Sequence, residues 1–310
     1  MKTMKKKIAI VLSGGGARGA LHVGALRALL EADVIPDMLV GTSIGACNAA
    51  FIALHGINQQ CLDKLTEVWR NAATTEILPS NYLWLSVRML FNRRVPDASN
   101  RMRDFMVANG LLPDLHFGDL KGVRLLLVAA DLNRGMQIVF GDDPSESILQ
   151  GVLASTALPP WVTPLARGDQ LLMDGGIVSN LPIQAAIEAG AEEIIALDLS
   201  DTHAEPESIQ GFGPFFTRVI QTVQRRQLAL ELDLAEARHV PTCYIRLSPT
   251  NSIPLWDFSH TEELMVQGYT ITAPAIARWL EERQPGWHPK RLAKNLQTWI
   301  QRLRLTGEAG

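Results

Sequence analysis

A serine between two glycines, in the stretch Gly41-Thr42-Ser43-Ile44-Gly45, has the surroundings best suited to catalysis. The apolar run before it predicts a strand and the run after it predicts a helix, as a Gly-x-Ser-x-Gly elbow requires. Such a turn is sharp and strains the serine backbone, and the glycines remove side chains that would collide with it. We therefore predict Ser43 as an exposed nucleophile. A serine that merely caps the following helix is the alternative.

A serine hydroxyl needs a base to remove its proton, and Asp174 is the candidate. It ends the short apolar run Leu171–Met173 and precedes Gly175 and Gly176, which let another loop approach. The carboxyl ends of parallel strands form a common crevice, so we expect Asp174 to meet Ser43 there. A simple Asp-Gly turn is the alternative.

A catalytic triad is a second way to activate the serine. The order Ser, Asp, His of the α/β hydrolases is met by Asp198 followed by His203, His239 or His260. None of these histidines has a distinctive setting. Hydrolases of that fold also place the elbow after several strands, whereas here it follows the second.

The loop Gly14-Gly15-Gly16-Ala17-Arg18-Gly19 follows the first predicted strand and opens a helix. Successive glycines can turn backbone N–H groups into one pocket at a helix N-terminus, which suits an oxyanion or a pyrophosphate equally. The spacing also fits a dinucleotide site, with Asp37 as a possible ribose ligand. A merely tight strand-to-helix turn is the remaining alternative.

The elements that must position these residues alternate between strands and helices as far as residue 200, which predicts an α/β fold with a largely parallel sheet covered on both faces. Short branched apolar runs predict strands at Lys7–Leu12, Met38–Gly41, Arg124–Asp131, Met136–Phe140, Leu171–Met173 and Glu193–Leu199. Helical spacing predicts helices at Arg18–Ala32, Ile44–His55, Gln59–Asn71, Ser99–Asn109, Glu146–Leu153 and Pro182–Ala189.

The chain divides near residue 205 into a catalytic α/β body, residues 7–205, and a mostly helical C-terminal region, residues 206–310, packed on it. The apolar stretch 78–97 predicts an inserted flap that could cover an acyl chain or simply pack. In the C-terminal region we expect helices at Phe215–His239, Thr261–Arg283 and Lys290–Leu305 and a last strand at Thr242–Leu247. The basic amphipathic stretch Lys290–Leu305 fits either peripheral contact with an anionic membrane or docking on the body.

Composition narrows the possible functions. A net charge of −3 and a pI near 6.2 provide no general attraction for nucleic acid, so we expect no nucleic-acid partner. Cys47, Cys61 and Cys243 lack metal-ligand spacing, and they are expected to be reduced thiols of a cytoplasmic protein. No apolar run reaches the length of a membrane span or a signal sequence, so membrane contact would be peripheral, at the inner membrane surface.

Four blocks of the chain, taken together, resemble the patatin-like phospholipases, especially small bacterial members. They are the glycine loop Gly14–Gly19, the elbow Gly41–Gly45, the middle block Ala154–Pro159 and Asp174–Gly176, and Asn180–Pro182 continues the pattern. The resemblance covers roughly residues 7–205 and implies a three-layer α/β/α fold. It also implies an esterase or phospholipase that cleaves ester-linked acyl chains of lipids.

Carried over to this sequence, the resemblance implies a Ser43–Asp174 catalytic dyad without a histidine, an oxyanion hole formed by the amides of Gly15, Gly16 and Ala17, and no metal or organic cofactor. The supporting loop positions would be Gly14, Arg18, Gly19, Gly41, Gly45, Gly175 and Gly176. Two alternatives stay open. One is a binding or regulatory protein of the same fold with little catalysis, and the other is a nucleotide-binding oxidoreductase that uses the glycine loop.

Overall fold

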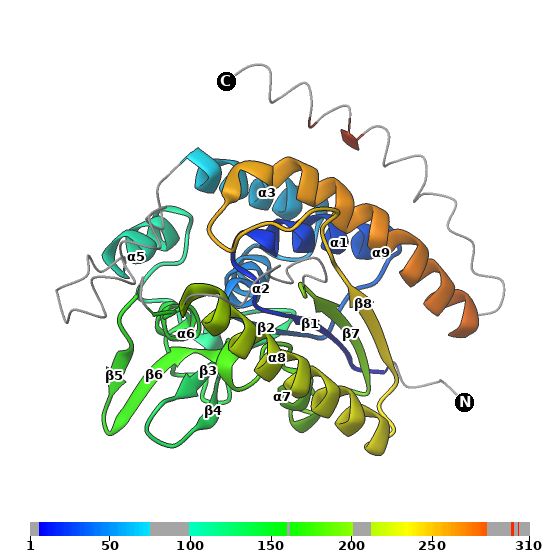
Figure 1. Cartoon of the computed structure of the whole chain (residues 1–310). Coiled ribbons are helices and arrows are strands. Elements are labelled where there is room, and N and C mark those ends of the chain that lie inside the picture. The colour runs from blue at the N-terminus through cyan, green and yellow to red at the C-terminus, as the bar shows by residue number, and fades with distance from the viewer. Residues whose placement is uncertain are drawn as a thin grey trace.

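The computed structural model describes residues 6–74, 99–159, 162–200, 212–283, 299–300 and 303. Eight strands of this part form one sheet with helices on both faces (Figure 1). The strands are β1 Ile8–Leu12, β2 Met38–Thr42, β3 Arg124–Asp131, β4 Met136–Phe140, β5 Leu165–Arg167, β6 Gln170–Asp174, β7 Glu193–Asp198 and β8 Thr242–Arg246. The α-helices are α1 Ala20–Glu31, α2 Ile44–His55, α3 Gln59–Thr74, α5 Ser99–Ala108, α6 Ile148–Ser155, α7 Ile183–Glu188, α8 Phe212–Ala237 and α9 Thr261–Arg283, and short 3-10 helices include η1 Gly16–Gly19 and η3 Gly175–Ile177.

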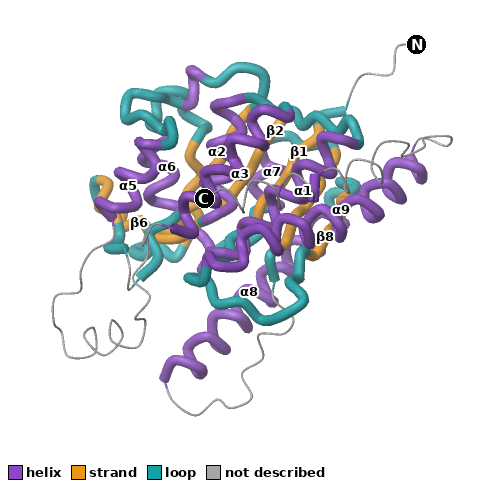
Figure 2. Tube along the Cα trace, turned by 90° about the horizontal axis from the view of Figure 1, so that it is seen from above, coloured by secondary structure: helices purple, strands orange, loops and turns teal. Residues whose placement is uncertain are grey.

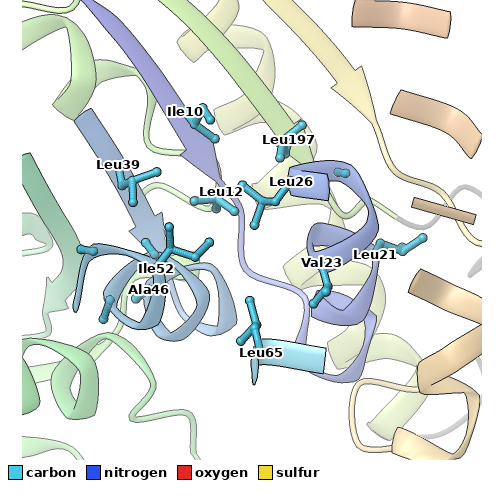
Figure 3. Packing of buried hydrophobic residues seen from close by; sticks show 14 of the residues in the cluster. Ile10, Leu12, Leu21, Val23, Leu26, Leu39, Ala46, Ile52, Leu65 and Leu197 are labelled. Atoms are coloured by element: carbon cyan, nitrogen blue, oxygen red, sulfur yellow. The ribbon is translucent and has the colours of Figure 1, made fainter. Parts of the chain in front are cut away.

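The two faces of the sheet bury alternate residues of the same strands. In β1, Ile10 and Leu12 pack in a core beneath α1, α2, α3, α6 and α9, where Leu39 and Leu197 join them (Figure 3). Ala9 and Val11 point the other way, into a second core under α7 and α8. Side chains of a strand alternate between faces, so a strand buried on both sides must be apolar throughout. The predicted three-layer α/β/α architecture is confirmed. Figure 2 shows one helical layer, with α1, α2, α3 and α9, lying over the strands.

The sheet is parallel in its centre and antiparallel on one side. β3, β2, β1, β7 and β8 pair in parallel in that order, whereas β4 and β6 run antiparallel to β3, and β5 antiparallel to β6. The alternation of strands and helices does not extend to β4, because the short connection 132–135 permits only an antiparallel return. The short strand β5, only Leu165–Arg167, was not predicted from the sequence.

Strand β3 brings the ends of β2 and β6 together. Its residues 127–131 pair with β4 along one edge, so β2 and β6 must both lie along the other edge. On that edge Thr42, the last residue of β2, is opposite Val128, and Asp174, the last residue of β6, is opposite Ala129. The two strands therefore run toward each other along this edge, and their carboxyl ends meet there. This differs from the expected meeting across the ends of parallel strands.

The region beyond residue 205 is built into the same sheet. β8 pairs in parallel with β7, and α9 packs against α1. The inserted flap 78–97 lies outside the described residues, as does most of Lys290–Leu305. Within that second stretch Trp299 and Leu303 are buried, with the Trp299 ring 5.8 Å from the ring of Tyr269. These two side chains face the body of the protein, which favours docking over membrane contact.

A buried polar cluster ties α2 to α1 and α3. The amide of Asn48 donates to the Gly19 carbonyl and lies 3.4 Å from Nδ1 of His22, while its oxygen accepts a hydrogen bond from Trp69 Nε1 at 3.0 Å. Burial lowers the pKa of His22 to about 3, so the ring is neutral. Nε2 of that ring lies 3.4 Å from the carbonyl of Leu197, which fits a proton on Nε2. The helices that follow the elbow and the glycine loop are thereby held in one arrangement.

We predict that Asn48→Ala lowers the free energy of unfolding by about 1–3 kcal/mol, because it leaves the Trp69 N–H buried without its acceptor. Urea unfolding followed by Trp fluorescence measures the change. Asn100→Ala, on the exposed surface of α5, is the control and should be nearly neutral. Equal stability of the two variants would contradict the role of the cluster.

Candidate active site

Ser43 occupies the sharp turn between β2 and α2. Its backbone has φ 56° and ψ −125°, a positive φ that a residue other than glycine rarely adopts. The backbone at the end of β1 comes so close that position 45 must be glycine, since a Cβ there would lie 2.2 Å from the Leu12 carbonyl oxygen. At position 41 a Cβ would lie 2.5 Å from the Gly45 carbonyl oxygen. The turn therefore has the strain and the flanking glycines that the sequence predicts for an elbow.

The side chain of Ser43 donates a hydrogen bond to Asp174. Ser43 Oγ lies 2.5 Å from Asp174 Oδ2, and the other carboxylate oxygen accepts from the Gly176 amide at 2.8 Å. The carboxylate is therefore fixed at both oxygens, with one aimed at the serine. The structure brings these two predicted residues together, although they are 131 positions apart in sequence.

Burial makes Asp174 a stronger base than an ordinary aspartate. The side chain is 4% exposed, and loss of hydration raises its pKa to about 6, although the hydrogen bonds from Ser43 and Gly176 oppose the rise. Cys47, one helical turn beyond Ser43, does not compete as a nucleophile. Burial, assisted by the nearby Asp174 charge, raises the pKa of this thiol to about 12, so the reactive thiolate is scarce.

Ser155, at the end of α6, holds the backbone of the elbow. Its hydroxyl accepts a hydrogen bond from the Ser43 amide at 2.9 Å and donates one to the Val128 carbonyl at 2.6 Å. Ser155 is fully buried, so both bonds form away from water. The serine of the middle block thus connects the elbow to β3. The sequence pattern marked this block but did not predict a role for Ser155.

The glycine loop lies next to the elbow. A Cβ at Gly14 would lie 3.1 Å from Ser43 Cβ and 2.6 Å from Asn180 Oδ1, so the loop approaches only because it lacks a side chain there. Asn180 pairs with Gly14 in both directions, because the Gly14 amide donates to the Asn180 carbonyl and Asn180 Nδ2 to the Gly14 carbonyl. This link, which was not predicted from the sequence, joins the glycine loop to the segment that follows Asp174.

The amides of the loop differ in availability. In the described part of the chain, the amides of Gly15 and Gly16 donate to no protein acceptor. The Ala17 amide, in contrast, donates to the Leu255 carbonyl at 2.7 Å. The expectation that Ala17 joins an oxyanion hole is therefore corrected, since its N–H is already engaged. Arg18 braces the loop, with Nε 3.3 Å from the Gly15 carbonyl oxygen.

The residues required by the dinucleotide alternative do not come together. Asp37 precedes β2 and accepts a hydrogen bond from the amide of Ile8, at the start of β1. The glycine loop follows the opposite, carboxyl end of β1. A strand length therefore separates the expected ribose ligand from the expected phosphate loop.

The triad alternative also lacks its geometry. Asp198 accepts hydrogen bonds from Ser200 and from the Tyr244 hydroxyl. His239 is exposed after the end of α8, and His260 is exposed beside Asp257 and Glu263. His203 lies outside the described residues. None of the described histidines is hydrogen-bonded to Ser43 or Asp174.

Metal-binding and membrane-spanning features are both missing from the part of the chain that the structure describes. Its residues include no group of three or more His, Cys, Asp or Glu side chains placed to hold a metal ion. None of its helices combines the length and apolar character needed to span a bilayer.

The protein thus has a three-layer α/β/α fold in which a serine on a strained elbow donates a hydrogen bond to an aspartate at the end of another strand. The chain belongs to the patatin-like phospholipase family, whose sequence model matches residues 10–187. The matched range covers the elbow, the glycine loop and Asp174.

Individual relatives match only part of their own length. The chain is 31% identical over 219 residues to mouse patatin-like phospholipase domain-containing protein 6, covering 68% of this chain and 15% of that protein. It is 25% identical over 304 residues to lysophospholipase NTE1 of Phaeosphaeria nodorum, covering 89% of this chain and 19% of that protein. Among solved structures, VipD from Legionella pneumophila aligns with a TM-score of 0.48 and 18% identity, covering 88% of this chain and 67% of VipD. The chain thus spans less than a fifth of the length of protein 6 and of NTE1.

We predict that the Asp174 carboxyl titrates near pH 6. Ser43→Ala should raise this pKa further, because it removes a hydrogen bond to the ionised form. Carboxyl carbon chemical shifts from ¹³C-labelled protein, followed between about pH 4 and about pH 8, measure both values. A midpoint close to that of an ordinary aspartate, or no change in the variant, would contradict the described environment.

Proposed function

We propose that this protein is a lipid acyl hydrolase, an esterase or phospholipase that cleaves ester-linked fatty acyl chains through a Ser43–Asp174 dyad. The observation that carries the proposal is the hydrogen bond of 2.5 Å from Ser43 Oγ to Asp174 Oδ2 at a strained elbow. Family membership supports lipid esters as the substrate class. The unused amides of Gly15 and Gly16 beside the elbow support acyl transfer.

In the first half-reaction Ser43 Oγ attacks the ester carbonyl carbon while Asp174 Oδ2 accepts the hydroxyl proton. The carbonyl oxygen becomes an oxyanion, and the amides of Gly15 and Gly16 donate to it. When the tetrahedral intermediate collapses, the bond to the leaving alcohol breaks and Asp174 returns the proton to that alcohol. An acyl-Ser43 ester remains.

In the second half-reaction water takes the place of the alcohol. The water oxygen attacks the acyl carbon while Asp174 accepts a proton from that water. When this second tetrahedral intermediate collapses, the bond from the acyl carbon to Ser43 Oγ breaks, Asp174 returns the proton to Oγ, and the fatty acid is released. A base is most effective when its pKa lies near the working pH. The pKa of Asp174, about 6, is still below neutral pH, so most of the carboxyl group is ionised there. Because this pKa is higher than that of an exposed aspartate, Asp174 is also the stronger base.

Ser43→Ala should abolish hydrolysis of short-chain aryl esters while the variant stays folded, with a cooperative thermal unfolding transition, because only the nucleophilic oxygen is removed. Ester turnover and thermal unfolding are measured on the same preparation. Thr42→Ser, which keeps the hydroxyl bonded to the Ser179 carbonyl, is the neighbouring control. Wild-type turnover in Ser43→Ala would exclude Ser43 as the nucleophile.

Asp174→Asn should reduce kcat by roughly 10²- to 10⁴-fold, because it keeps the shape and removes the proton acceptor. His260→Ala should leave kcat largely intact, since this histidine contacts Asp257 and Glu263 rather than the dyad. His203→Ala and His239→Ala complete the comparison. A histidine variant as damaged as Asp174→Asn would point instead to a triad.

A further inference from the structure

Glu231 is a buried carboxyl group outside the range of the family match. It lies on α8, is 7% exposed and is held by two hydrogen bonds. Oε1 accepts from the Ser179 hydroxyl at 2.5 Å, and Oε2 accepts from the Gln184 amide at 2.6 Å. A buried carboxylate is costly unless its oxygens are satisfied. Burial raises the pKa of Glu231, the charge of Glu188 adds to the rise, and the two hydrogen bonds oppose it.

Ser179, the partner of Glu231, connects three parts of the site. Its amide donates to the Gly175 carbonyl at 2.9 Å, directly after Asp174. Its carbonyl accepts from Thr42 Oγ1 at 2.9 Å, directly before Ser43. Its hydroxyl donates to Glu231. One buried serine thus joins the aspartate loop, the nucleophile strand and α8.

Gln227, one helical turn before Glu231, holds the same loop at a second point. Its Nε2 donates to the Ile177 carbonyl at 2.5 Å. Residues four positions apart lie on the same face of a helix, so Gln227 and Glu231 both bind the loop 175–180 from one face of α8. Figure 1 shows α8 running beside α7 on the face of the sheet opposite α1.

The loop that α8 holds determines the aim of the aspartate. The Gly176 amide belongs to η3 and donates to Asp174 Oδ1, while Oδ2 accepts from Ser43. A shift of η3 would therefore rotate the carboxylate away from the serine. Misplacement of a catalytic group by about 1 Å can cost up to about 10²-fold in rate.

We propose that Glu231 is a positioning residue, which acts through Ser179 to fix the loop 175–180 so that Asp174 stays aimed at Ser43. This inference rests on the proposed function. It also gives the region beyond residue 205 a part in catalysis that the family match does not assign. Glu231 itself touches neither substrate nor the reacting atoms.

The test compares four variants in ester kinetics. In Glu231→Ala and Ser179→Ala the link between α8 and the loop is cut, so kcat should fall by roughly 10- to 100-fold with KM nearly unchanged. In Glu231→Gln the amide oxygen can accept from Gln184 and the amide N–H can donate to the Ser179 hydroxyl, so kcat should recover to within about 3-fold of wild type. Glu236→Gln, an exposed position on the same helix, is the matched control.

Hydrogen exchange supplies a readout that does not depend on activity. Amide exchange in residues 174–180 should be faster in Glu231→Ala and Ser179→Ala than in wild type, because the loop has lost an anchor. The window stops before residue 184, whose amide loses its own acceptor in Glu231→Ala. The double variant should be little worse than either single variant, since both cut the same link.

The outcomes are separable. A folded Glu231→Ala or Ser179→Ala variant with wild-type kcat and wild-type exchange would overturn the inference. If Glu231→Ala does not fold, Ser179→Ala alone decides between the same two outcomes. If wild type itself hydrolyses no ester, the proposed function fails, and exchange in residues 174–180 still decides whether Glu231 anchors the loop.

Discussion

The site depends on the way β3 pairs with two strands along one edge. β2 ends opposite Val128 and the antiparallel β6 ends opposite Ala129, so consecutive residues of β3 fix the ends of both strands. The hydrogen bond between Ser43 and Asp174 follows from this register, because each residue lies at the end of its strand. Ser155 strengthens the arrangement by joining the elbow amide to the Val128 carbonyl. A displacement of either strand by one residue would separate the pair or turn a side chain to the other face.

Several buried polar groups around the site find hydrogen-bond partners in other segments of the chain. Asp174 has Ser43 and Gly176, Asn48 has Gly19 and Trp69, and the Ala17 amide has the Leu255 carbonyl. A buried polar group left without a partner lowers the free energy of unfolding by more than a typical hydrogen bond adds to it. The Leu255 carbonyl holds the glycine loop, and side chains of α8 hold the loop that follows Asp174. The region beyond residue 205 therefore supports both loops of the site. The sheet likewise continues across that boundary into β8.

Local signals in the sequence predicted the central strands and the places of Ser43 and Asp174 at strand ends. The Gly-x-Ser-x-Gly pattern required a strand-to-helix turn at Ser43, and the apolar run before Asp174 placed it at a strand end. Tertiary relations were not readable in this way. The antiparallel direction of β6, the engagement of the Ala17 amide and the partnership of Glu231 with Ser179 each join segments far apart in the chain. Strand β5 was missed because three residues carry too little periodicity to be recognised.

In the proposed mechanism Ser43, Asp174 and the amides of Gly15 and Gly16 act on one acyl group. A crystal structure of the protein inactivated by a fluorophosphonate would test this most directly. We expect phosphorus bonded to Ser43 Oγ, with a phosphonyl oxygen about 2.7–3.1 Å from the amide nitrogens of Gly15 and Gly16 and Asp174 beside Ser43. An adduct on another residue, or a phosphonyl oxygen turned away from the glycine loop, would contradict this mechanism.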